Sequence, residues 1–423
     1  MKNNELLSGL LTEIREHIQS EEFLEEFRVA RHFVRDRTLS MEKMVMFLLF
    51  HSKLSLDGKL DQLRERFPDY EFPFVSKQAL SKARYGIQHE LFQTLFELSG
   101  NFYYANRTSS KLWRSKYHLF AIDGSDQEVP SSESTFREFG KQSDKKNPDL
   151  FWSMARASIM YDVLEDIIID AAIEKQFFSE RELSLRHLSR FADLALQQDS
   201  IVLYDRGYYS AEVFSDWVRA GCNVLMRLST KLNFCRLKGD DVKSIVKAPD
   251  GTEIPCRVLK YTLNNGETEY LITNIMDEEL TNVILGELYF YRWKIETKYL
   301  EIKEHWKIEE FTGTGVLAVR QDFFITMLHA NLAAIIKLQA DELIDQNSRA
   351  ANKYKYMARK TYIIGKLHLN FVKWIITSFT QEDIDEVICE ASKKRSQIQS
   401  NRSSKRKRHT RARKHYNNRK ASF

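Results

Sequence analysis

The stretch Leu119-Phe120-Ala121-Ile122-Asp123-Gly124-Ser125 decides the fold class, because an apolar run of strand length ends at an acidic residue, a glycine and a serine. A second stretch of the same kind is Ile201-Val202-Leu203-Tyr204, which leads to Asp205-Arg206-Gly207. Short apolar runs bounded by turn residues predict buried strands. We therefore expect two core strands, each with an aspartate at its end.

The segments around these two strands predict further elements of an α/β domain. Residues 153–161 and 164–173 are rich in β-branched and apolar residues, which favours two more strands. Residues 179–198 carry apolar side chains at helical spacing, and residues 224–228 form another apolar run after a helix that begins near Ser210. Residues 230–275 alternate in short runs and predict a β-strand insertion.

Helical regions are expected on both sides of this domain. Apolar residues between residues 6 and 18 recur at steps of three and four, and Ser76 is a predicted N-cap of a short basic helix. A second amphipathic helix is expected from residue 90 to residue 98, so the region is either a small DNA-binding unit or a plain helical bundle with a basic face. A long helix is expected over residues 278–309, and others over residues 316–340 and 352–377.

These patterns give a predicted division of the chain. The expected parts are a helical N-terminal region (1–112), an α/β domain in two pieces (113–229 and 276–340), the β insertion (230–275), a helical C-terminal region (341–390) and a basic tail (391–423).

The tail is the most strongly basic part of the chain. It contains thirteen Lys and Arg and no Asp or Glu, so the total net charge of +5 leaves −8 on residues 1–390. Such a run repels itself too strongly to fold alone, and we expect a disordered tail. DNA binding through release of counterions is the favoured interpretation, and a merely solvated tail is the alternative.

Several classes of protein are disfavoured by the sequence. Met44 to Phe50 is the longest uninterrupted apolar run and is far shorter than a membrane span, and no secretory signal is evident at the N-terminus. The four cysteines show no Cys-x-x-Cys pair, so we expect reduced thiols rather than a zinc site or disulfides. A protein that acts in the cytoplasm, with no membrane partner, is expected.

Three acidic residues form the candidate site. Asp123 and Asp205 are predicted at strand ends, where a sheet can direct carboxylates to one point, although strand-end aspartates are also common turn formers. On one helix, positions 289, 292, 296 and 303 fall at roughly 0, 300, 340 and 320 degrees, which is one narrow stripe. Glu296 lies on this stripe, and a solvated helix face is the alternative interpretation.

The stripe Tyr289-x-x-Arg292-x-x-x-Glu296-x-x-x-x-x-x-Lys303 resembles the Tyr-Arg-Glu-Lys signature of the DDE transposases of bacterial insertion sequences, in the insertion-sequence-four family. The segments Ala121-Ile122-Asp123-Gly124-Ser125 and Leu203-Tyr204-Asp205-Arg206-Gly207-Tyr208 resemble the two aspartate blocks of that family, in the same order. The resemblance covers about residues 70 to 340 and rests on a specific combination of motifs.

The resemblance implies a ribonuclease H-like catalytic domain in which Asp123, Asp205 and Glu296 are the catalytic residues and the metal ligands. Carboxylate oxygens suit Mg²⁺, with Mn²⁺ as a substitute, and two such ions can activate the attacking oxygen and neutralise the leaving one. The expected reaction is hydrolysis of DNA phosphodiesters followed by strand transfer, in which a DNA 3′-hydroxyl replaces water as the nucleophile.

The resemblance also implies DNA-contacting residues and partners. Residues that match Tyr289, Arg292 and Lys303 contact phosphates near the transposon end, and Tyr270 matches an aromatic residue that holds a flipped base when relatives form a DNA hairpin. Tyr270 stands where the best-known relative has a tryptophan, so the sequence leaves the hairpin route and separate cuts both open. The expected partners are double-stranded DNA, as transposon ends and target, and a second copy in a homodimer at the nucleoid.

Two other functions are compatible with parts of this pattern. A DNA-binding protein without chemistry would share the helical N-terminus and the tail, but its three acidic residues would have no task. A ribonuclease H-like nuclease that cuts without joining would share the acidic residues, and end recognition with strand transfer distinguishes the transposase.

Overall fold

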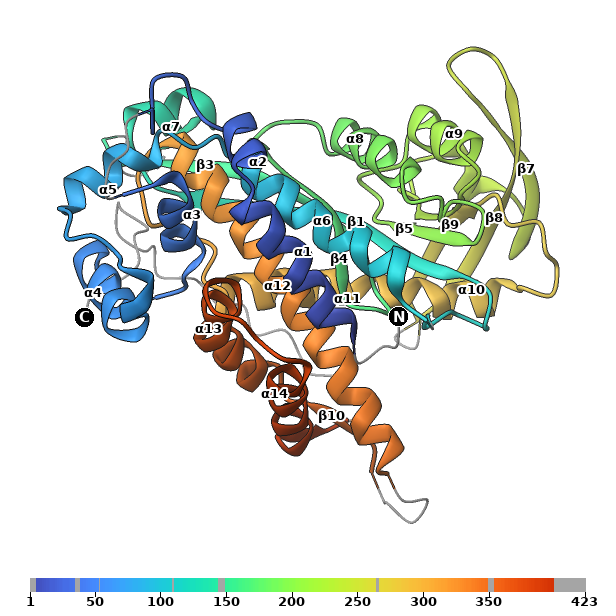
Figure 1. Ribbon diagram of the computed structural model, residues 1–423. Coiled ribbons are helices and arrows are strands. Elements are labelled where there is room, and N and C mark those ends of the chain that lie inside the picture. The colour runs from blue at the N-terminus through green and yellow to red at the C-terminus, as the bar shows by residue number, and fades with distance from the viewer. Residues whose placement is uncertain are drawn as a thin grey trace. The chain divides into compact units, whose positions relative to one another are not determined.

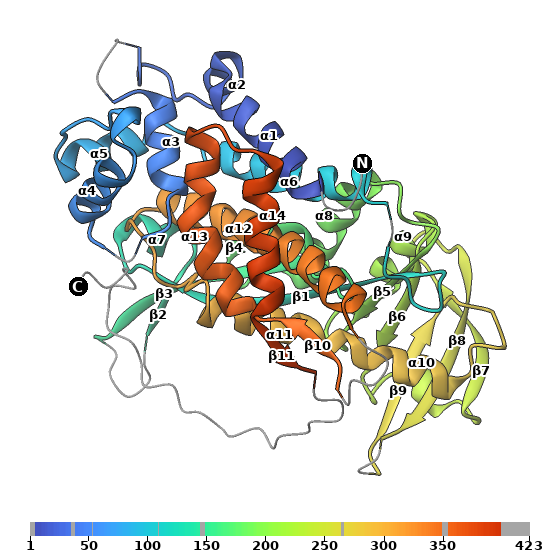
Figure 2. The same ribbon diagram turned by 60° about the horizontal axis from the view of Figure 1, so that its bottom comes forward.

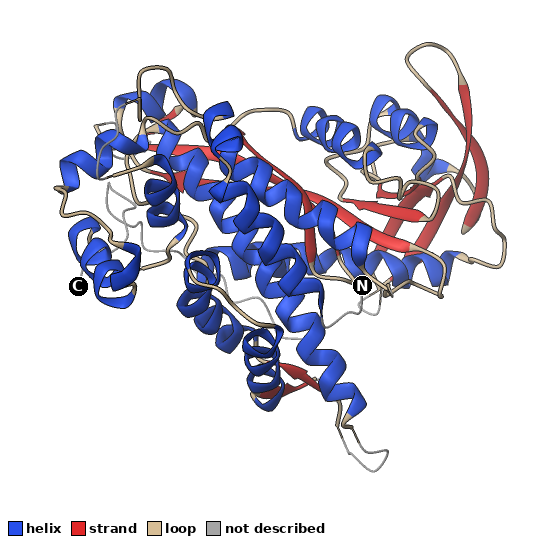
Figure 3. Cartoon of the chain, viewed as in Figure 1, coloured by secondary structure: helices blue, strands red, loops and turns tan. Residues whose placement is uncertain are grey.

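The computed structural model describes residues 5–34, 39–52, 54–108, 110–143, 149–263, 266–348 and 354–398. Within these ranges the chain forms two compact units (Figure 1). The first unit contains residues 1–109, 127–155 and 302–423, and the second contains residues 110–126 and 156–301. Together they make a mixed α/β protein with one large sheet and many helices, as the sequence predicts (Figure 3).

The first unit is predominantly helical. Its helices are α1 (Leu6–Gln19), α2 (Glu21–Glu26), α3 (Met41–Leu49), α4 (Leu56–Arg66), α5 (Lys77–Arg84), α6 (Glu90–Asn106), α7 (Glu133–Glu138), α12 (Val316–Gln346), α13 (Lys360–Ile376) and α14 (Gln381–Lys393), with the short 3-10 helix η2 (Pro68–Tyr70). Helix α12 packs against α6 and α1, and also against α13 and α14 (Figure 2). The predicted N-cap is present, since the Ser76 hydroxyl accepts a hydrogen bond from the Ala79 amide at 3.2 Å.

Helix α12 is the core helix of this unit. Among the described residues it is the one helix whose length and composition would allow a membrane span, but 89 % of its most apolar stretch is buried inside the protein. A helix that is apolar on all sides is typical of a protein core as well as of a membrane. Burial among α6, α13 and α14 therefore accounts for its composition.

The second unit is built on the sheet. Its strands are β1 (His118–Val129), β3 (Phe151–Asp162), β4 (Ile167–Lys175), β5 (Ser200–Tyr204), β6 (Asn223–Arg227), β7 (Asp241–Lys247), β8 (Glu253–Thr262) and β9 (Thr268–Thr273), of which β1 and β3 run in part through the first unit. The sheet also includes the short strand β2 (Lys141–Ser143), its order is β2-β3-β1-β5-β6-β9-β8-β7, and β4 pairs with β3. The pairs β1–β5 and β5–β6 are parallel, whereas β6–β9, β9–β8 and β8–β7 are antiparallel.

Helices cover this sheet on both faces. Helices α8 (Glu180–Ala192) and α9 (Ala211–Arg219) lie on one face, and α10 (Asn282–Tyr289) lies on the other (Figures 1 and 3). The short 3-10 helices η3 (Asn233–Arg236) and η4 (Phe290–Arg292) and the helix α11 (Trp293–Glu304) complete the unit. Strands buried under helices on both faces explain the continuous apolar runs near residues 119 and 201.

Residues 230–275, the predicted β insertion, extend this sheet, because β9 pairs with β6 and then with β8. The sequence Asn264-Asn265-Gly266 predicts a turn within this insertion, and residues 264 and 265 lie outside the described residues. The two units also group the chain differently from the expected linear division, since residues 302–340 pack with the helical N-terminal region through α12 and α6.

Three predicted elements differ from the structure. Strand β1 does not end at Asp123 but continues to Val129, because β3 pairs along its other edge. The long helix expected over residues 278–309 is interrupted by η4 and ends at Glu304. The helix expected over residues 352–377 is α13, which begins at Lys360 after a short strand.

The basic tail is ordered where it begins. Residues up to Lys393 belong to α14, and β11 (Arg395–Gln397) pairs antiparallel with β10 (Tyr356–Ala358), so the expected disorder is wrong for residues 391–397. A backbone ladder satisfies the amide groups of this basic segment, which therefore stays on the protein. Residues 399–423 lie outside the described residues.

Candidate active site

Asp123 and Asp205 are neighbours because of the register between β1 and β5. The two strands are parallel and pair residue by residue from His118 with Ser200 to Ile122 with Tyr204. The next residue on each strand is the aspartate, so both side chains emerge beside each other at the carboxyl end of β5. Adjacent parallel strands lie about 4.8 Å apart, which brings the two carboxylates to one site.

Glu296 joins this site through Arg292. The Arg292 guanidinium donates to Glu296 Oε1 at 3.0 Å and lies 3.6 Å from Asp123 Oδ2. Its side chain is only 4 % exposed, and against the lowering effect of burial the pKa of Arg292 is raised by Tyr289, then by Asp205, and also by Glu296 and Asp123. The guanidinium therefore lies among all three candidate carboxylates and offsets part of their charge.

Tyr289 is a buried support of Asp205. Its hydroxyl donates to the Tyr204 carbonyl at 3.1 Å and lies 3.5 Å from Asp205 Oδ1. Burial, with the charge of Asp205 among the lesser causes, raises the pKa of Tyr289. The last residue of α10 is thus fixed to the end of β5.

The backbone of Asp123 is held from two sides. The Tyr299 hydroxyl donates to the Asp123 carbonyl at 2.9 Å, and the Ser158 hydroxyl approaches the same oxygen at 3.4 Å. Ser158 is hydrogen-bonded to His187 Nε2 at 2.9 Å, and His187 Nδ1 lies 2.7 Å from Asp170 Oδ2. This buried chain connects β1, β3, β4 and α8 directly behind the site.

The electrostatics around Asp123 favour a bound cation. Burial raises the pKa of Asp123 to about 7, against the opposing effects of Arg292 and the Gly124 amide, and the charges of Glu180 and Asp205 add to the rise. A carboxyl group with its pKa raised by burial and like charges is stabilised in its charged form when a cation binds. The set of hard oxygen donors suits Mg²⁺ or Mn²⁺.

The side chains would have to move to hold such an ion. Across the described ranges, no three acidic, histidine or cysteine side chains lie close enough together to hold a metal as they stand. Glu296 bonds to Arg292, and Glu180 pairs with Arg156. The residues fit a divalent ion in charge and donor type, and an ion would compete with these arginines for the carboxylates.

The other two predicted DNA-contacting residues are Lys303 and Tyr270. Lys303, near the end of α11, pairs with Glu309 at 3.5 Å, and its side chain is 15 % exposed. Tyr270 lies on β9 opposite Lys260 and is half-buried. Tyr289, Arg292 and Lys303 are therefore all engaged by the protein itself, and contact with a phosphate would require each to exchange a partner.

The basic helix α5 carries three basic residues, of which one is buried and two are exposed. Arg84 is buried and pairs with Asp322 at 2.7 Å, and it also donates to Gln321 at 2.6 Å. Lys77 and Lys82 on the same helix are exposed. Only the two lysines present charge to solvent, whereas Arg84 fastens α5 to α12.

Sequence reasoning missed two residues that belong to this site. Tyr299 lies one turn after Glu296, so helical periodicity could have placed it on the same side. Glu180 influences the pKa of Asp123, but no motif in the sequence links it to the aspartates. Its position depends on the packing of α8 over the sheet.

The comparisons with known proteins agree with this geometry. The sequence model of the family described as "Transposase DDE domain" matches residues 114–332. The transposase InsG of insertion sequence element IS4 from Escherichia coli K12 is 26 % identical over 289 residues, which are 64 % of this chain. A putative transposase of Sinorhizobium fredii, y4zB, is 28 % identical over 151 residues, or 32 % of this chain and 42 % of its own.

The extent of these matches is limited. The aligned residues span 63 % of the length of InsG. Among solved structures, the piggyBac transposase synaptic complex with hairpin DNA aligns with a TM-score of 0.47 at 9 % identity, over 89 % of this chain and 84 % of that one.

Proposed function

This chain belongs to the transposase DDE domain family, and on that premise we propose that it cuts DNA at the ends of an insertion sequence and joins those ends to target DNA. The observation that carries the proposal is the β1–β5 register, which sets Asp123 beside Asp205, with Glu296 linked to them through Arg292. A merely structural role would not require three carboxylates around one buried arginine.

The proposed catalytic domain is ribonuclease H-like and includes residues 113–229 and 276–340, with residues 230–275 as its insertion. The parallel strands β1, β5 and β6 and the helix that carries Glu296 support this assignment. We assign residues 1–112 to DNA binding, residues 341–390 to a helical C-terminal region and the following basic residues to contacts with phosphates.

Asp123, Asp205 and Glu296 would hold two divalent ions, Mg²⁺ or Mn²⁺. Such ions supply an activated oxygen nucleophile and neutralise the leaving oxygen when bound. The chain itself fixes the donors, since Tyr289 lies against Asp205 and Tyr299 holds the Asp123 carbonyl. Once the carboxylates have exchanged their arginine partners for the ions, this support would keep them in place during the reaction.

The DNA contacts follow from the available charges. The exposed Lys77 and Lys82 on α5 and the basic residues 399–423 would bind the backbone of either DNA partner. Arg292 and Lys303 would contact phosphates at the cut end after exchanging Glu296 and Glu309. Tyr270 would support a flipped base if the end is opened through a hairpin, and two copies of the chain would bridge the two ends.

The test uses the purified chain and DNA that carries the inverted repeats flanking its gene. We expect cleavage and joining with Mg²⁺ or Mn²⁺ and none with EDTA. Replacing Asp123, Asp205 or Glu296 by Ala should lower the cleavage rate by at least about 10³, or roughly 4 kcal/mol of barrier, while a gel shift still detects end binding.

The outcomes separate the rival functions. End binding without metal-dependent cleavage in the wild-type chain would indicate a DNA-binding protein. Cleavage without joining to a target would indicate a nuclease. Normal cleavage by one of the three alanine variants would remove that residue from the site.

A further inference from the structure

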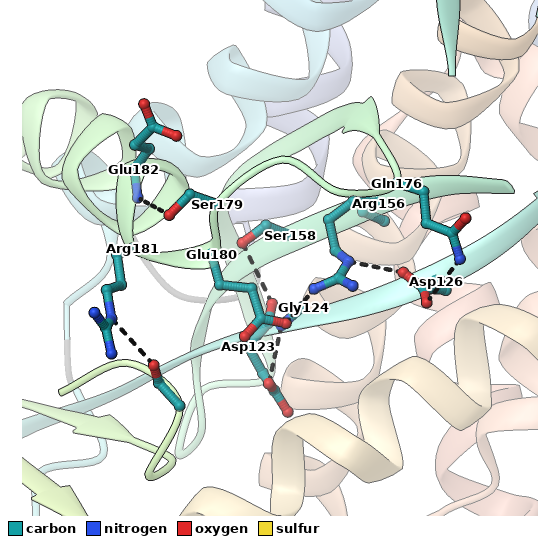
Figure 4. A network of polar contacts seen from close by, with 12 residues as sticks. Asp123, Gly124, Asp126, Arg156, Ser158, Gln176, Ser179, Glu180, Arg181 and Glu182 are labelled. Carbon is teal, nitrogen blue, oxygen red and sulfur yellow. Dashed lines mark hydrogen bonds and ion pairs between the residues drawn. The ribbon is translucent and has the colours of Figure 1, made fainter. Parts of the chain in front are cut away.

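A fourth carboxylate, that of Glu180, lies between two glycines, Gly124 and Gly207, that follow the two aspartates of the site. Glu180 is the first residue of α8, directly after the N-cap Ser179. A methyl group built on Gly124 would stand 3.0 Å from Glu180 Oε1, and one built on Gly207 would stand 3.6 Å from Oε2. Each of these glycines lies one or two residues after a candidate aspartate, and the side chain of Glu180 occupies the space that they leave. Figure 4 shows Glu180 beside Gly124.

Arg156 on β3 holds Glu180 in this place. Its guanidinium pairs with Glu180 Oε1 and also with Asp126 Oδ1 at 2.7 Å (Figure 4). Gln176 Nε2 donates to the other oxygen of Asp126 at 3.4 Å. Oε2 of Glu180, the oxygen on the Gly207 side, is therefore not the one that Arg156 engages.

The number of charges shows that this arrangement lacks cations. Five carboxylates, those of Asp123, Asp205, Glu296, Glu180 and Asp126, share three guanidiniums, those of Arg292, Arg156 and Arg227, and Arg227 also pairs with a sixth carboxylate, Glu269, at 3.0 Å. Like charges at short range in a partly buried site are unfavourable unless a cation joins them.

Tyr208 gives an independent indication of a ligand at this place. Its side chain is buried, at 1 % exposure, and within the described part of the chain its hydroxyl has no hydrogen-bond partner. Burial, and next the charges of Asp123 and Glu180, raise the pKa of Tyr208 well above its ordinary value. A buried hydroxyl without a partner is unfavourable, and a water or phosphate oxygen within its reach would supply the missing acceptor.

We propose that Glu180 is a further catalytic residue of the transposase site, whose carboxylate supplies an oxygen ligand to the divalent ion shared with Asp123 and Asp205. Arg156 is its positioning residue, and the Tyr208 hydroxyl donates to an oxygen of the ion's surroundings. This inference rests on the proposed function, because it assumes that Asp123 and Asp205 bind a metal. A purely structural Glu180 would only tie α8 to β3 through Arg156.

The experiment measures Mn²⁺ binding to the metal-free full chain by electron paramagnetic resonance, without DNA and without turnover. Glu180→Gln keeps the size and a hydrogen bond to Arg156 but removes the charge, and we expect its Mn²⁺ affinity to fall at least about 10-fold. Glu182→Gln is the matched control, because Glu182 lies on the same helix and is exposed. Its affinity should equal that of the wild type.

Asp123→Asn distinguishes an error in the assignment of Glu180 from an error in the proposed metal site itself. If Asp123→Asn loses Mn²⁺ and Glu180→Gln binds it like the wild type, the assignment of Glu180 is wrong and the proposed function stands. If Asp123→Asn also binds normally, the proposed metal site itself is wrong.

A second variant covers a failure of Glu180→Gln to fold, which circular dichroism would reveal. Glu180→Asp keeps the charge and withdraws it by one methylene from Gly124 and Gly207. We expect a folded protein with at least about 3-fold weaker Mn²⁺ binding, since metal affinity depends on the distance and geometry of the donors. Unchanged affinity in this variant would overturn the proposal.

Discussion

Replacing Arg292 by Ala should make the stability of the second unit depend on divalent metal. In the structure the guanidinium is nearly buried and offsets charge on Glu296 and Asp123. Its removal leaves both carboxylates without this positive partner, in a place where burial and neighbouring charges already disfavour ionisation of Asp123. We therefore expect a destabilised protein in EDTA.

The magnitude follows from the burial of the partners. Breaking a fully buried ion pair by removing one side costs about 3 to 5 kcal/mol. The carboxylate side chains are 21 % and 29 % exposed, so water screens part of the loss, and about 2 to 3 kcal/mol is a reasonable expectation. For a cooperative unit of this size that corresponds to a melting temperature lower by roughly 4 to 12 °C.

Metal should reverse this loss. Saturation with Mn²⁺ at about 100 times its dissociation constant adds roughly 2.7 kcal/mol of stability, which is close to the loss itself. In the wild-type protein the ion competes with Arg292 for the same carboxylates, so its stabilisation by Mn²⁺ should be smaller than that of the variant. Arg292→Lys keeps a charge without the planar fork and should fall between the two.

The assay is thermal unfolding by circular dichroism in EDTA and across an Mn²⁺ titration. Arg137→Ala is a suitable control, since Arg137 forms an ion pair on the surface in which its side chain is 80 % exposed, and its loss should change the stability by less than about 0.5 kcal/mol. An Arg292→Ala protein that melts like the wild type in EDTA, or gains no more than the wild type from Mn²⁺, would refute the reasoning.

Three further outcomes are expected. Ser158→Ala removes a buried hydroxyl that is hydrogen-bonded to His187 at 2.9 Å and should lower the free energy of unfolding of its unit by about 1 to 3 kcal/mol. A urea titration would detect this change, and an unchanged unfolding curve would contradict it. Burial raises the pKa of Cys222 and of Cys256 to about 11, so their thiolates form only as the pH rises toward that value. In the unfolded chain a thiol has a pKa of about 8.5. At pH 8 both thiols of the folded protein should therefore react with iodoacetamide at least roughly 100-fold more slowly than in the unfolded chain, which mass spectrometry can measure. Truncation after residue 398 removes ten Lys and Arg and should flatten the dependence of log DNA affinity on log salt without lowering the melting temperature. Truncation after residue 390 should also lower the melting temperature, because β11 is lost. An unchanged salt slope would show that the residues beyond 398 do not bind DNA.

The strands and their aspartates could be predicted because the signal is local. The apolar run before Asp205 is short and ends at Arg206-Gly207, and β5 indeed ends at Tyr204. The run before Asp123 has the same appearance, yet β1 continues to Val129. The difference lies in β3, a partner strand from later in the chain, and a local pattern of residues does not contain that pairing.

The interruption between α10 and α11 could not be predicted from propensity. Residues 290–292 contain neither glycine nor proline, and the apolar period runs through them. Tyr289 is fixed to the end of β5 and Arg292 to the carboxylates, and these tertiary contacts coincide with a tighter 3-10 turn. Glu180 was missed for a similar reason, because it meets the aspartates only through the packing of α8.

The pairing of Ile122 with Tyr204 has a consequence for insertions and deletions. Side chains alternate across a strand, so one extra or missing residue within the five paired positions of β1 or β5 would turn its aspartate to the opposite face of the sheet. The turn between β7 and β8 lies outside this register, and its length can change without disturbing the pair. In a mutagenesis library, single-residue deletions within residues 118–122 or 200–204 should therefore abolish the proposed DNA cleavage even where the protein still folds. Length changes in the turn at residues 249–251 should be far better tolerated.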